Sequence, residues 1–252
     1  MSLLEVRNVK KVYTTRLGAN QVQALSNVNF SVEDGEYVAI MGESGSGKTT
    51  LLNILAALDR PTAGEILLNG KNTVEIKNKE LSAFRRNNLG FVFQDFNLLD
   101  TFSLKDNIFL PLVLSGEQYP QMMQKLEPIA KKLEITHLLE KYPYEVSGGQ
   151  KQRLAIARAL ARNPEILIFD DSFSALDYKT DAALRKGLAE KLGGVTCMIV
   201  AQRIGTIRNA DKIVVLDEGK AVGIGTHEEL IKNCAVYREI AMSQLSAEEL
   251  GA

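Results

Sequence analysis

Hydrophobic positions at the start of the chain alternate with polar ones or fall on β-branched residues. This pattern predicts two strands, Leu3–Val12 and Val22–Val32, joined by a turn at Gly18-Ala19-Asn20. The short apolar run Tyr37–Met41 predicts a third strand. We interpret the first two strands as an antiparallel sheet that lies beside a separate core.

The middle of the chain changes to a helical period. Apolar residues follow this period over most of Leu98–Arg162, with helical segments at Leu104–Val113 and Met122–Leu133. The prolines of this region are expected to break its helices; they are Pro111, Pro120, Pro128 and Pro143. The region therefore predicts an inserted helical subdomain.

Further strands and helices are expected on both sides of that subdomain, and after it, from Ile166 to Leu245, they alternate. Such alternation is typical of βαβ units and predicts a parallel sheet. The expected strands are Gly64–Leu68, Leu89–Val92, Ile166–Asp170, Val195–Val200 and Lys212–Asp217, and the expected helices are Lys48–Leu58, Thr180–Leu192, Thr226–Asn233 and Val236–Leu245. We find no repeat or linker that divides the chain, so we expect one domain spanning residues 1–252.

Composition and charge narrow the class of protein. The chain has 252 residues, 45% of them hydrophobic, which is enough for a large core. Its 30 basic residues balance 31 acidic ones, which does not favour nucleic acid as a partner. The longest apolar run, Ile108–Leu114, falls far short of the roughly 20 residues that span a bilayer. Cys197 and Cys234 have no metal or redox spacing, and no signal-peptide pattern is present, so we expect a cytoplasmic protein.

A phosphate-binding pattern follows the third strand. Residues 42–49 match G-x-x-x-x-G-K-[ST], a pattern that needs a preceding strand and a following helix. The glycines let backbone N–H groups approach a polyphosphate, Lys48 reaches the outer phosphates, and the Thr49 hydroxyl can bind Mg²⁺. The pattern predicts binding of ATP or GTP. The residues expected to contact the nucleotide are Gly42, Ser44, Gly45, Ser46, Gly47, Lys48, Thr49 and Thr50.

A second pattern narrows the kind of nucleotide-binding protein. Val146-Ser147-Gly148-Gly149-Gln150 opens an amphipathic helix that Ser147 can cap, and its glycines leave amide groups bare for an anion. Here the sequence resembles the ATP-binding cassette (ABC) family, whose signature reads L-S-G-G-Q, with Val146 in place of leucine. The resemblance implies an α/β P-loop NTPase with a RecA-like core, an antiparallel β subdomain and an inserted helical subdomain. It implies residues 1–36 for the β part, 37–97 and 155–245 for the core, and 98–154 for the helical part.

The resemblance covers nearly the whole chain and assigns further residues. Tyr13 stands where the family stacks an aromatic ring on adenine, and Gln94 matches the glutamine that meets Mg²⁺ and the attacking water. Asp170 ends an apolar strand and matches the carboxylate that holds Mg²⁺. Asp177 belongs to a loop through which two ATP sites sense each other. The implied metal ligands are therefore Thr49, Gln94 and Asp170.

The family also implies partners and a location. Two cassettes pack head to tail, so that ATP lies between the phosphate loop of one chain and residues 147–150 of the other; these residues are Ser147, Gly148, Gly149 and Gln150. The helical subdomain contacts transmembrane permease subunits. The implied location is cytoplasmic and peripheral, at the inner face of the cell membrane. Homodimer and heterodimer both stay open.

Two positions depart from the family pattern, and both concern hydrolysis. Asp171 stands where a glutamate normally polarises the attacking water, and it is one methylene shorter. A displacement of about 1 Å can cost about a hundredfold in rate. Gln202 stands where a histidine normally contacts the terminal phosphate, and a glutamine can donate a hydrogen bond but cannot act as an imidazole does. We therefore expect weak ATP hydrolysis, with Asp171, Gln202 and Gln94 as catalytic residues.

The two halves of the chain resemble different branches of the family. Up to about Gln150 the chain resembles the separate ATPase subunits of lipoprotein-release, macrolide and antimicrobial-peptide exporters, as in Arg85–Gln94. From about Leu154 it resembles the degenerate-site cassette of heterodimeric exporters, as in Phe169–Asp177. It is either a natural mosaic or an engineered chimera. Three functions stay open. The first is the ATPase subunit of an exporter of peptides, drugs or lipids, and the second is a non-transport cassette protein that acts on translation or DNA, which would usually bring a second cassette or a long coiled coil. The third is a regulatory module that dimerises on ATP without useful turnover.

Overall fold

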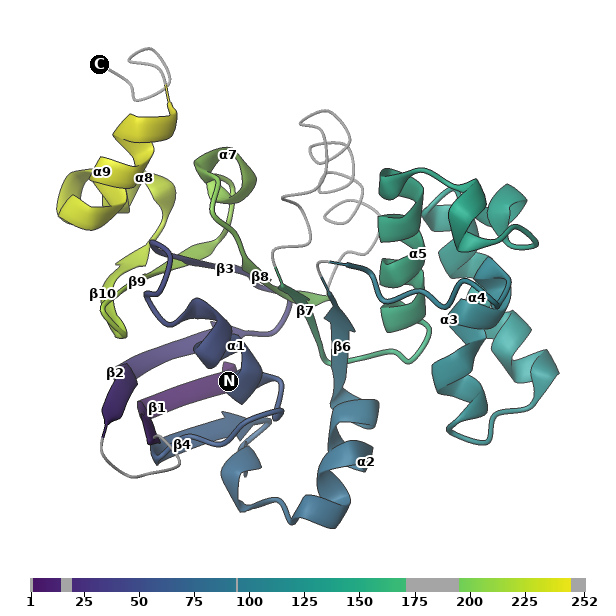
Figure 1. Cartoon of the computed structure of the whole chain (residues 1–252), viewed down its shortest axis with the longest axis horizontal. Helices are drawn as coiled ribbons and strands as arrows, with labels where there is room; N and C mark the ends of the chain where they lie inside the picture. The colour runs from purple at the N-terminus through teal and green to yellow at the C-terminus, as the bar shows by residue number, and fades with distance from the viewer. Residues whose placement is uncertain (1, 15–19, 94, 171–194, 246–252) are drawn as a thin grey trace. The chain divides into compact units, whose positions relative to one another are not determined.

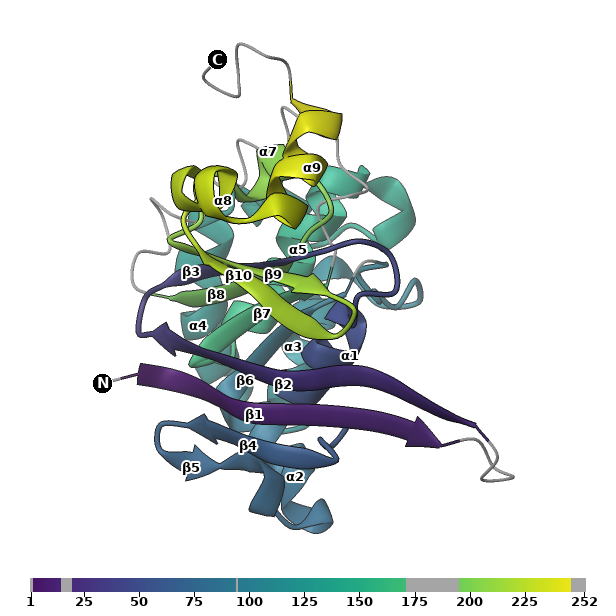
Figure 2. The same ribbon diagram turned by 90° about the vertical axis from the view of Figure 1, so that its left-hand side faces the viewer.

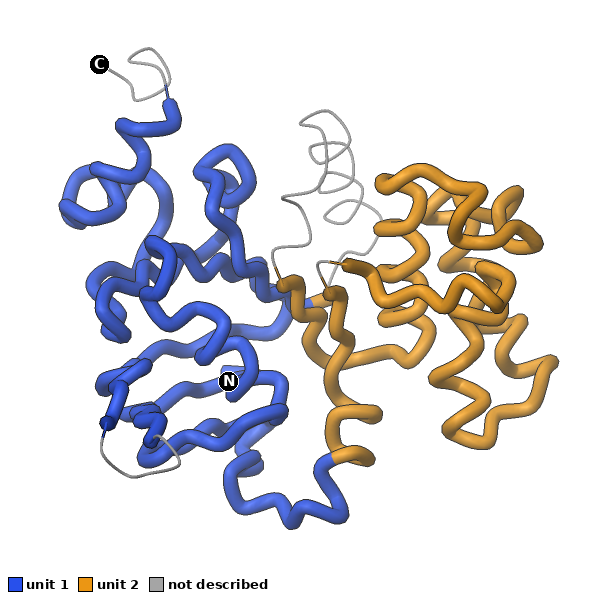
Figure 3. The backbone as a smooth tube through the Cα atoms, viewed as in Figure 1, with its two compact units in different colours: residues 1–81, 196–252 blue, residues 82–195 orange. Residues whose placement is uncertain are grey.

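The computed structural model describes residues 2–14, 20–93, 95–170 and 195–245. The chain forms two compact units (Figure 3): unit 1 comprises residues 1–81 and 196–252, and unit 2 comprises residues 82–195. Several sequence predictions fall outside the described residues; they concern the helix Thr180–Leu192, the site residues Gln94, Asp171 and Asp177, and the first two residues of the turn at Gly18-Ala19-Asn20.

Unit 1 contains an antiparallel sheet in the strand order β2-β1-β4-β5. β1 (Ser2–Thr14) pairs with β2 (Gln21–Glu33) on one side and with β4 (Ala63–Leu68) on the other, and β5 (Lys71–Asn72) pairs with β4. The hydrophobic residues that alternate along these strands are buried; they include Leu4, Val6, Val28, Phe30 and Val32. The predicted antiparallel sheet is confirmed, and both of its long strands extend beyond the predicted bounds.

A second set of strands in unit 1 is mainly parallel. β3 (Tyr37–Met41) lies between β8 (Thr196–Val200) and β9 (Lys212–Asp217), and β10 (Lys220–Gly225) is antiparallel to β9. From Val38 to Met41 the side chains of β3 are buried on both faces, as is typical of a parallel strand covered by other layers.

Four α-helices lie entirely within the described part of unit 1. α1 (Lys48–Leu55) lies between the parallel strands and β2 (Figure 1), and α7 (Ile204–Ile207) follows β8. α8 (His227–Asn233) and α9 (Ala235–Gln244) pack on the β9 and β10 end of this set (Figure 2). The carboxyl ends of β3 and β8 therefore lie among helices that belong to the same unit.

Unit 2 combines two parallel strands with a group of helices. β6 (Leu89–Val92) pairs with β7 (Ile166–Asp170), and α2 (Asn78–Asn88) leads into β6 from unit 1. The group consists of α3 (Leu104–Val113), α4 (Tyr119–Lys132) and α5 (Gly148–Leu160), which pack on one another (Figure 1). The side chains at this packing have no exposed surface; examples are Leu104, Ile108, Leu126 and Leu154.

Prolines interrupt these helices less than the sequence analysis predicts. Pro111 lies inside α3 and Pro128 lies inside α4, so the predicted breaks at these positions are wrong. Each helix buries an apolar face of its own, and that packing outweighs one lost backbone hydrogen bond. Pro120 and Pro143 stand in the first turns of α4 and of the 3₁₀ turn Pro143–Glu145, where a helix does not need their N–H groups.

Three further differences have local causes. α1 ends at Leu55 instead of Leu58, because Ala57 has a φ of +53° and the N–H group of Leu58 turns back to the carbonyl oxygen of Asn53. α2 has no counterpart in the prediction because Phe84 is its only buried residue, which leaves no apolar stripe to recognise. β10 was missed because it is half-exposed at alternate positions and contains two glycines.

The predicted fold class is confirmed. The molecule is an α/β protein with a parallel strand set, an antiparallel sheet and a helical part. No helix in the described ranges has the length and hydropathy needed to cross a bilayer.

Candidate functional site

A tight loop joins β3 to α1 and carries the phosphate-binding pattern. Two of its glycines are required by the structure. A Cβ atom on Gly42 would lie 2.1 Å from the carbonyl oxygen of Leu216 and 2.5 Å from Ser46 Oγ. Gly47 has a φ of +102°, which L-residues rarely adopt, and a Cβ there would lie 2.6 Å from the carbonyl oxygen of Ala24. The loop can follow this path only because neither position carries a side chain.

Lys48 and Ser46 are buried within this loop. Lys48 Nζ donates hydrogen bonds to the carbonyl oxygens of Gly42, at 2.8 Å, and Glu43, at 2.6 Å. Ser46 Oγ is buried and has no hydrogen-bond partner among the described residues. A buried hydroxyl left without a partner costs about 1–3 kcal/mol. A cation and an unsatisfied hydroxyl in one loop fit an anion, so the residues present fit the phosphates of a nucleotide.

The first turn of α1 adds backbone donors to the loop. The N-terminal N–H groups of a helix have no partner within the helix and carry partial positive charge. α1 has no side chain that caps its N-terminus and no acidic residue in its first turn, so no part of the helix competes with an anion there. Ser44, Gly45 and Thr49 are exposed, and Thr50 is half-buried. The Thr49 hydroxyl is therefore accessible to a metal ion.

Tyr13, the residue expected to stack on adenine, lies near the end of β1 and is held by two neighbours. Its phenol group donates a 2.9 Å hydrogen bond to Asp59 Oδ2. Lys11 Nζ donates to Asp59 Oδ1 at 2.7 Å and lies 4.8 Å from the centre of the Tyr13 ring. Tyr13 is 42% exposed. A base can therefore stack only on the face of the ring that Lys11 does not cover.

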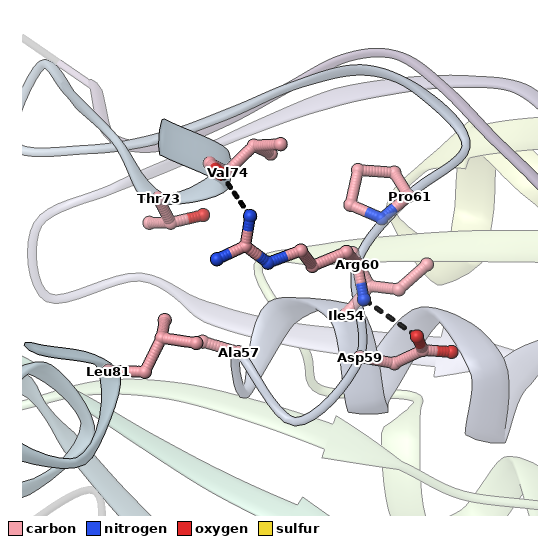
Figure 4. A pocket seen from close by; sticks show the side chains of 8 residues that line it. All are labelled: Ile54, Ala57, Asp59, Arg60, Pro61, Thr73, Val74 and Leu81. Carbon is pink, nitrogen blue, oxygen red and sulfur yellow. Dashed lines mark hydrogen bonds between the residues drawn. The ribbon is translucent and has the colours of Figure 1, made fainter. Parts of the chain in front are cut away.

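Asp59 also lines a small pocket at the end of α1 (Figure 4). Partial burial acts to raise the pKa of the Asp59 carboxyl, but hydrogen bonds from Lys11, the Arg60 N–H group and Tyr13 hold that pKa below its usual value. Arg60 crosses the pocket and donates to the carbonyl oxygens of Val74, at 3.2 Å, and Ile76, at 2.7 Å. The pocket is thus occupied by a structural side chain, while the Asp59 carboxylate stays charged and keeps its contacts with β1.

Gln202, the residue expected near the terminal phosphate, follows β8. β8 and β3 are parallel neighbours with Val200 opposite Ile40, and the N–H group of Ala201 donates to the carbonyl oxygen of Ile40 at 3.2 Å. Parallel strands end at a common edge, which is where ligands bind in α/β sheets. Gly42 opens the phosphate loop at the same edge. The structure therefore brings exposed Gln202 and the phosphate loop together within unit 1.

The signature segment lies at the N-terminus of α5 in unit 2. Ser147 Oγ accepts a 3.4 Å hydrogen bond from the Gln150 N–H group, and Gln150 Oε1 accepts a 2.9 Å bond from the Ser147 N–H group. Ser147 therefore caps the helix as predicted, and the side-chain oxygen of Gln150 is engaged in the same cap. Gly148 is exposed and Gly149 half-buried, and a Cβ on Gly148 would meet nothing within 4 Å. This helix end is open to a ligand approaching from outside the chain.

Asp170 ends β7, as the sequence analysis expects of a carboxylate that binds a metal ion. It is half-buried, and burial raises the pKa of its carboxyl. The described part of the chain contains no group of three or more His, Cys, Asp or Glu side chains that could hold a metal ion. A metal ion at Asp170 would therefore take its other oxygen ligands from groups of another kind, such as a hydroxyl, a side-chain amide, water or the phosphates of the nucleotide.

Arg158 is a residue that the sequence analysis did not single out. Its guanidinium group donates to the carbonyl oxygens of Phe96, at 2.5 Å, and Asn97, at 2.7 Å. Both of these residues have left-handed backbone conformations, and they follow Gln94 closely in the chain. Burial lowers the pKa of Arg158. The sequence signal that could have revealed it is that Arg158 is the one charged residue in the otherwise apolar last two turns of α5. Its two hydrogen bonds hold the backbone at Phe96 and Asn97.

The chain thus contains both a phosphate loop between a parallel strand and a helix and a signature segment that caps a helix. These two features together define a P-loop nucleotide-binding cassette. Residues 25–174 match the family model described as ABC transporter. The chain belongs to the ABC transporter family. As a member of this family it is the ATP-binding subunit of an ABC transporter and an ATP hydrolase.

Similar proteins include both exporters and importers. The chain is 39% identical over 223 residues to the bacitracin export ATP-binding protein BceA of Halalkalibacterium halodurans, covering 87% of each chain. It is 37% identical over 235 residues to the methionine import ATP-binding protein MetN 1 of Bacillus cereus, covering 92% of this chain and 67% of that protein. A solved structure is described as the dimeric post-hydrolysis state of the ATP-binding cassette MJ0796 bound to ADP and Pi. It is similar at a TM-score of 0.77 and 37% identity, over 89% of this chain and 98% of that one.

Proposed function

We propose that this chain serves an exporter of peptides, drugs or lipids, binds Mg-ATP at a head-to-tail dimer interface, and hydrolyses it slowly. The observation that carries the proposal is the phosphate loop, in which Lys48 and the unsatisfied Ser46 hydroxyl lie beside the bare N-terminus of α1. Gln202 lies at the same edge of the sheet. This arrangement can hold a nucleoside triphosphate by its phosphates and direct the terminal phosphate toward Gln202.

The direction of transport rests on the sequence. The similar proteins include one named for bacitracin export and one named for methionine import, so similarity alone does not decide the direction. Export is supported by the resemblance of both halves of the chain to exporter ATPases. The partners we propose are transmembrane permease subunits and a second cassette. The location we propose is cytoplasmic and peripheral at the inner face of the cell membrane.

The complete ATP site is proposed to be shared by two cassettes that each contain both units. Mg²⁺ would take ligands from Thr49, Gln94 and Asp170. Residues 147–150 of the second cassette would meet the nucleotide through the exposed N-terminus of α5. Asp177 is proposed to belong to the loop through which the two ATP sites sense each other. Support for this arrangement comes from the dimeric state of the MJ0796 cassette.

Slow hydrolysis is proposed from Asp171 and Gln202. The test compares ATP turnover of the purified chain with that of the Asp171→Glu, Gln202→His double variant. Restoring a full-length base and an imidazole is expected to raise turnover at least about tenfold. Equal rates for the two chains would contradict the proposal that the native site is impaired.

The same comparison of ATP turnover also tests the alternative function, a regulatory module. That function predicts ATP-dependent dimers of the native chain, visible by size-exclusion chromatography, without measurable turnover. Lys48→Ala is expected to abolish nucleotide binding in either case, because it removes the cation of the phosphate loop. Unchanged ATP affinity in Lys48→Ala would overturn the site assignment itself.

A further inference from the structure

The last residue of α9 makes two hydrogen bonds to the segment that carries Gln202. Gln244 Oε1 accepts a 2.8 Å bond from the Ile204 N–H group, and Gln244 Nε2 donates a 2.9 Å bond to the carbonyl oxygen of Gln202. The backbone partners fix which way the amide points, since an N–H group needs the oxygen and a carbonyl needs the nitrogen. One side chain thus holds the backbone on both sides of Arg203.

The position of Gln244 is itself fixed by buried residues. Tyr237, Ala241 and Gln244 follow one another at helical spacing and share one face of α9. Tyr237 and Ala241 have no exposed surface, and the Tyr237 hydroxyl lies 2.7 Å from His227 Nδ1 of α8. Ser243, one residue before Gln244, instead donates to the carbonyl oxygen of Ile240 within the helix. α9 therefore presents Gln244 from a rigid base.

The two bonds serve a helix end that has no cap of its own. α7 begins at Ile204, and its N-cap residue Arg203 makes no side-chain capping bond. The Ile204 N–H group is one of the donors that a helix N-terminus leaves unsatisfied, and Gln244 supplies its acceptor from a distance of 40 residues along the chain. On the other side, the bond from Ala201 to Ile40 ties the same segment to the strand that opens the phosphate loop. Gln202 thus lies between two backbone anchors.

We propose that Gln244 is a positioning residue for ATP hydrolysis, because it fixes the backbone of Gln202 at the edge of the sheet where the phosphate loop begins. The inference rests on the proposed role of Gln202 toward the terminal phosphate. The two bonds restrict rotation of the peptide groups around Arg203, and they thereby help to set the direction of the residue at 202. Binding of the nucleotide is held mainly by the phosphate loop, so turnover is affected and affinity is not.

The test uses three variants of the full chain, each made in the native background and in the Asp171→Glu, Gln202→His background. Gln244→Met keeps the size of the side chain and removes both bonds. Gln244→Glu keeps the acceptor for Ile204 and removes the donor to Gln202. Ser243→Ala is the matched control on the same turn. The measurements are kcat and KM for ATP, ATP affinity by calorimetry, thermal unfolding, and hydrogen exchange of the Ile204 amide by NMR.

Gln244→Met is expected to speed exchange at Ile204 and to lower kcat about tenfold with KM within about twofold, as for a displacement smaller than 1 Å. Gln244→Glu should keep Ile204 protected and lose part of kcat, while Ser243→Ala changes neither quantity. An unchanged kcat in Gln244→Met, or a joint loss of ATP affinity and thermal stability, would overturn the inference. If none of the variants hydrolyses ATP, including the Asp171→Glu, Gln202→His double variant, the proposed hydrolysis fails. Protection of the Ile204 amide from exchange then decides whether the two hydrogen bonds of Gln244 hold this segment.

Discussion

The phenol group of Tyr13 is tied to Asp59, a residue 46 positions away that follows α1. Because Lys11 bonds the same carboxylate and covers one face of the ring, the tyrosine is held in place by a charged pair. Its orientation therefore depends on a contact between β1 and the end of α1, and not on the short strand end alone.

This contact predicts how Tyr13 variants bind ATP. Tyr13→Ala removes the stacking surface and should weaken ATP binding about tenfold or more. Tyr13→Phe keeps the ring but loses the bond to Asp59, and should weaken it about threefold. Calorimetry with ATP and with inorganic tripolyphosphate separates the two contributions, since the tripolyphosphate has no base. Glu5→Gln, which breaks the exposed Arg7–Glu5 pair on the same strand, is the control. Equal ATP affinities for Tyr13→Ala and the native chain would exclude base stacking there.

The glycines of the phosphate loop predict a separation between stability and binding. Gly47 and Gly70 both have left-handed backbones, but a Cβ on Gly70 would meet nothing within 4 Å. Gly70→Ala should lower the free energy of unfolding by about 1 kcal/mol from backbone strain and leave ATP affinity unchanged. Gly47→Ala adds a clash with the Ala24 carbonyl and should lose ATP binding as well. Denaturant titration and calorimetry on the two variants give both quantities, and equal ATP affinities would contradict the need for glycine at 47.

Arg158 predicts a loss of local order on substitution. Replacing it with alanine leaves two carbonyl groups without their donor, so the free energy of unfolding should fall by about 2 kcal/mol. Hydrogen exchange should also rise in the segment after Gln94. Arg153→Ala is the control, because Arg153 makes a long ion pair of 3.8 Å with Glu134 on the surface. Similar losses in the two variants would show that Arg158 has no special role.

His227 predicts that stability depends on pH. Burial, together with the positive charge of Arg208, lowers the pKa of the imidazole below its ordinary value of 6.5. As the pH falls through 6.5 the unfolded chain takes up a proton before the folded one does, so stability present above this pH declines. The neutral ring can also accept a bond from Tyr237, which the protonated ring cannot. Thermal unfolding between pH 7.5 and 5.5 should show a smaller decline in His227→Gln than in the native chain and in the His137→Gln control.

The sequence was sufficient where a pattern repeats along the chain. Alternation predicted β1 and β2, and the apolar run Tyr37–Met41 together with the glycine pattern predicted the strand and loop that hold the phosphates. It was insufficient where a contact joins distant segments. Nothing in the residues near Tyr13 points to Asp59, and nothing near Gln202 points to Gln244, because both contacts arise only when the strands and helices are assembled.

A second group of failures came from residues whose environment overrides their tendency. Pro111 and Pro128 are accommodated by helix packing. By contrast, α2 forms although it has almost no buried face from which a helix could be predicted. Arg158 shows the same lesson for the site, since its backbone partners lie about 60 residues earlier in the chain. Local propensity describes a segment in isolation. The conformation and contacts of these residues are instead determined by neighbours in the folded structure, whose positions cannot be inferred from the sequence alone.

The mutual cap of Ser147 and Gln150 has a consequence for how two cassettes meet. The first turn of α5 is already ordered in the single chain. The free-energy cost of ordering its backbone, about 1–2 kcal/mol per residue, is therefore met during folding and not during association. A binding surface that is preorganised in this way loses less affinity to ordering when it docks. For the proposed dimer, the association rate should then be set by the diffusion and orientation of two surfaces that are already folded. No folding step is needed between the encounter of the two cassettes and formation of the dimer.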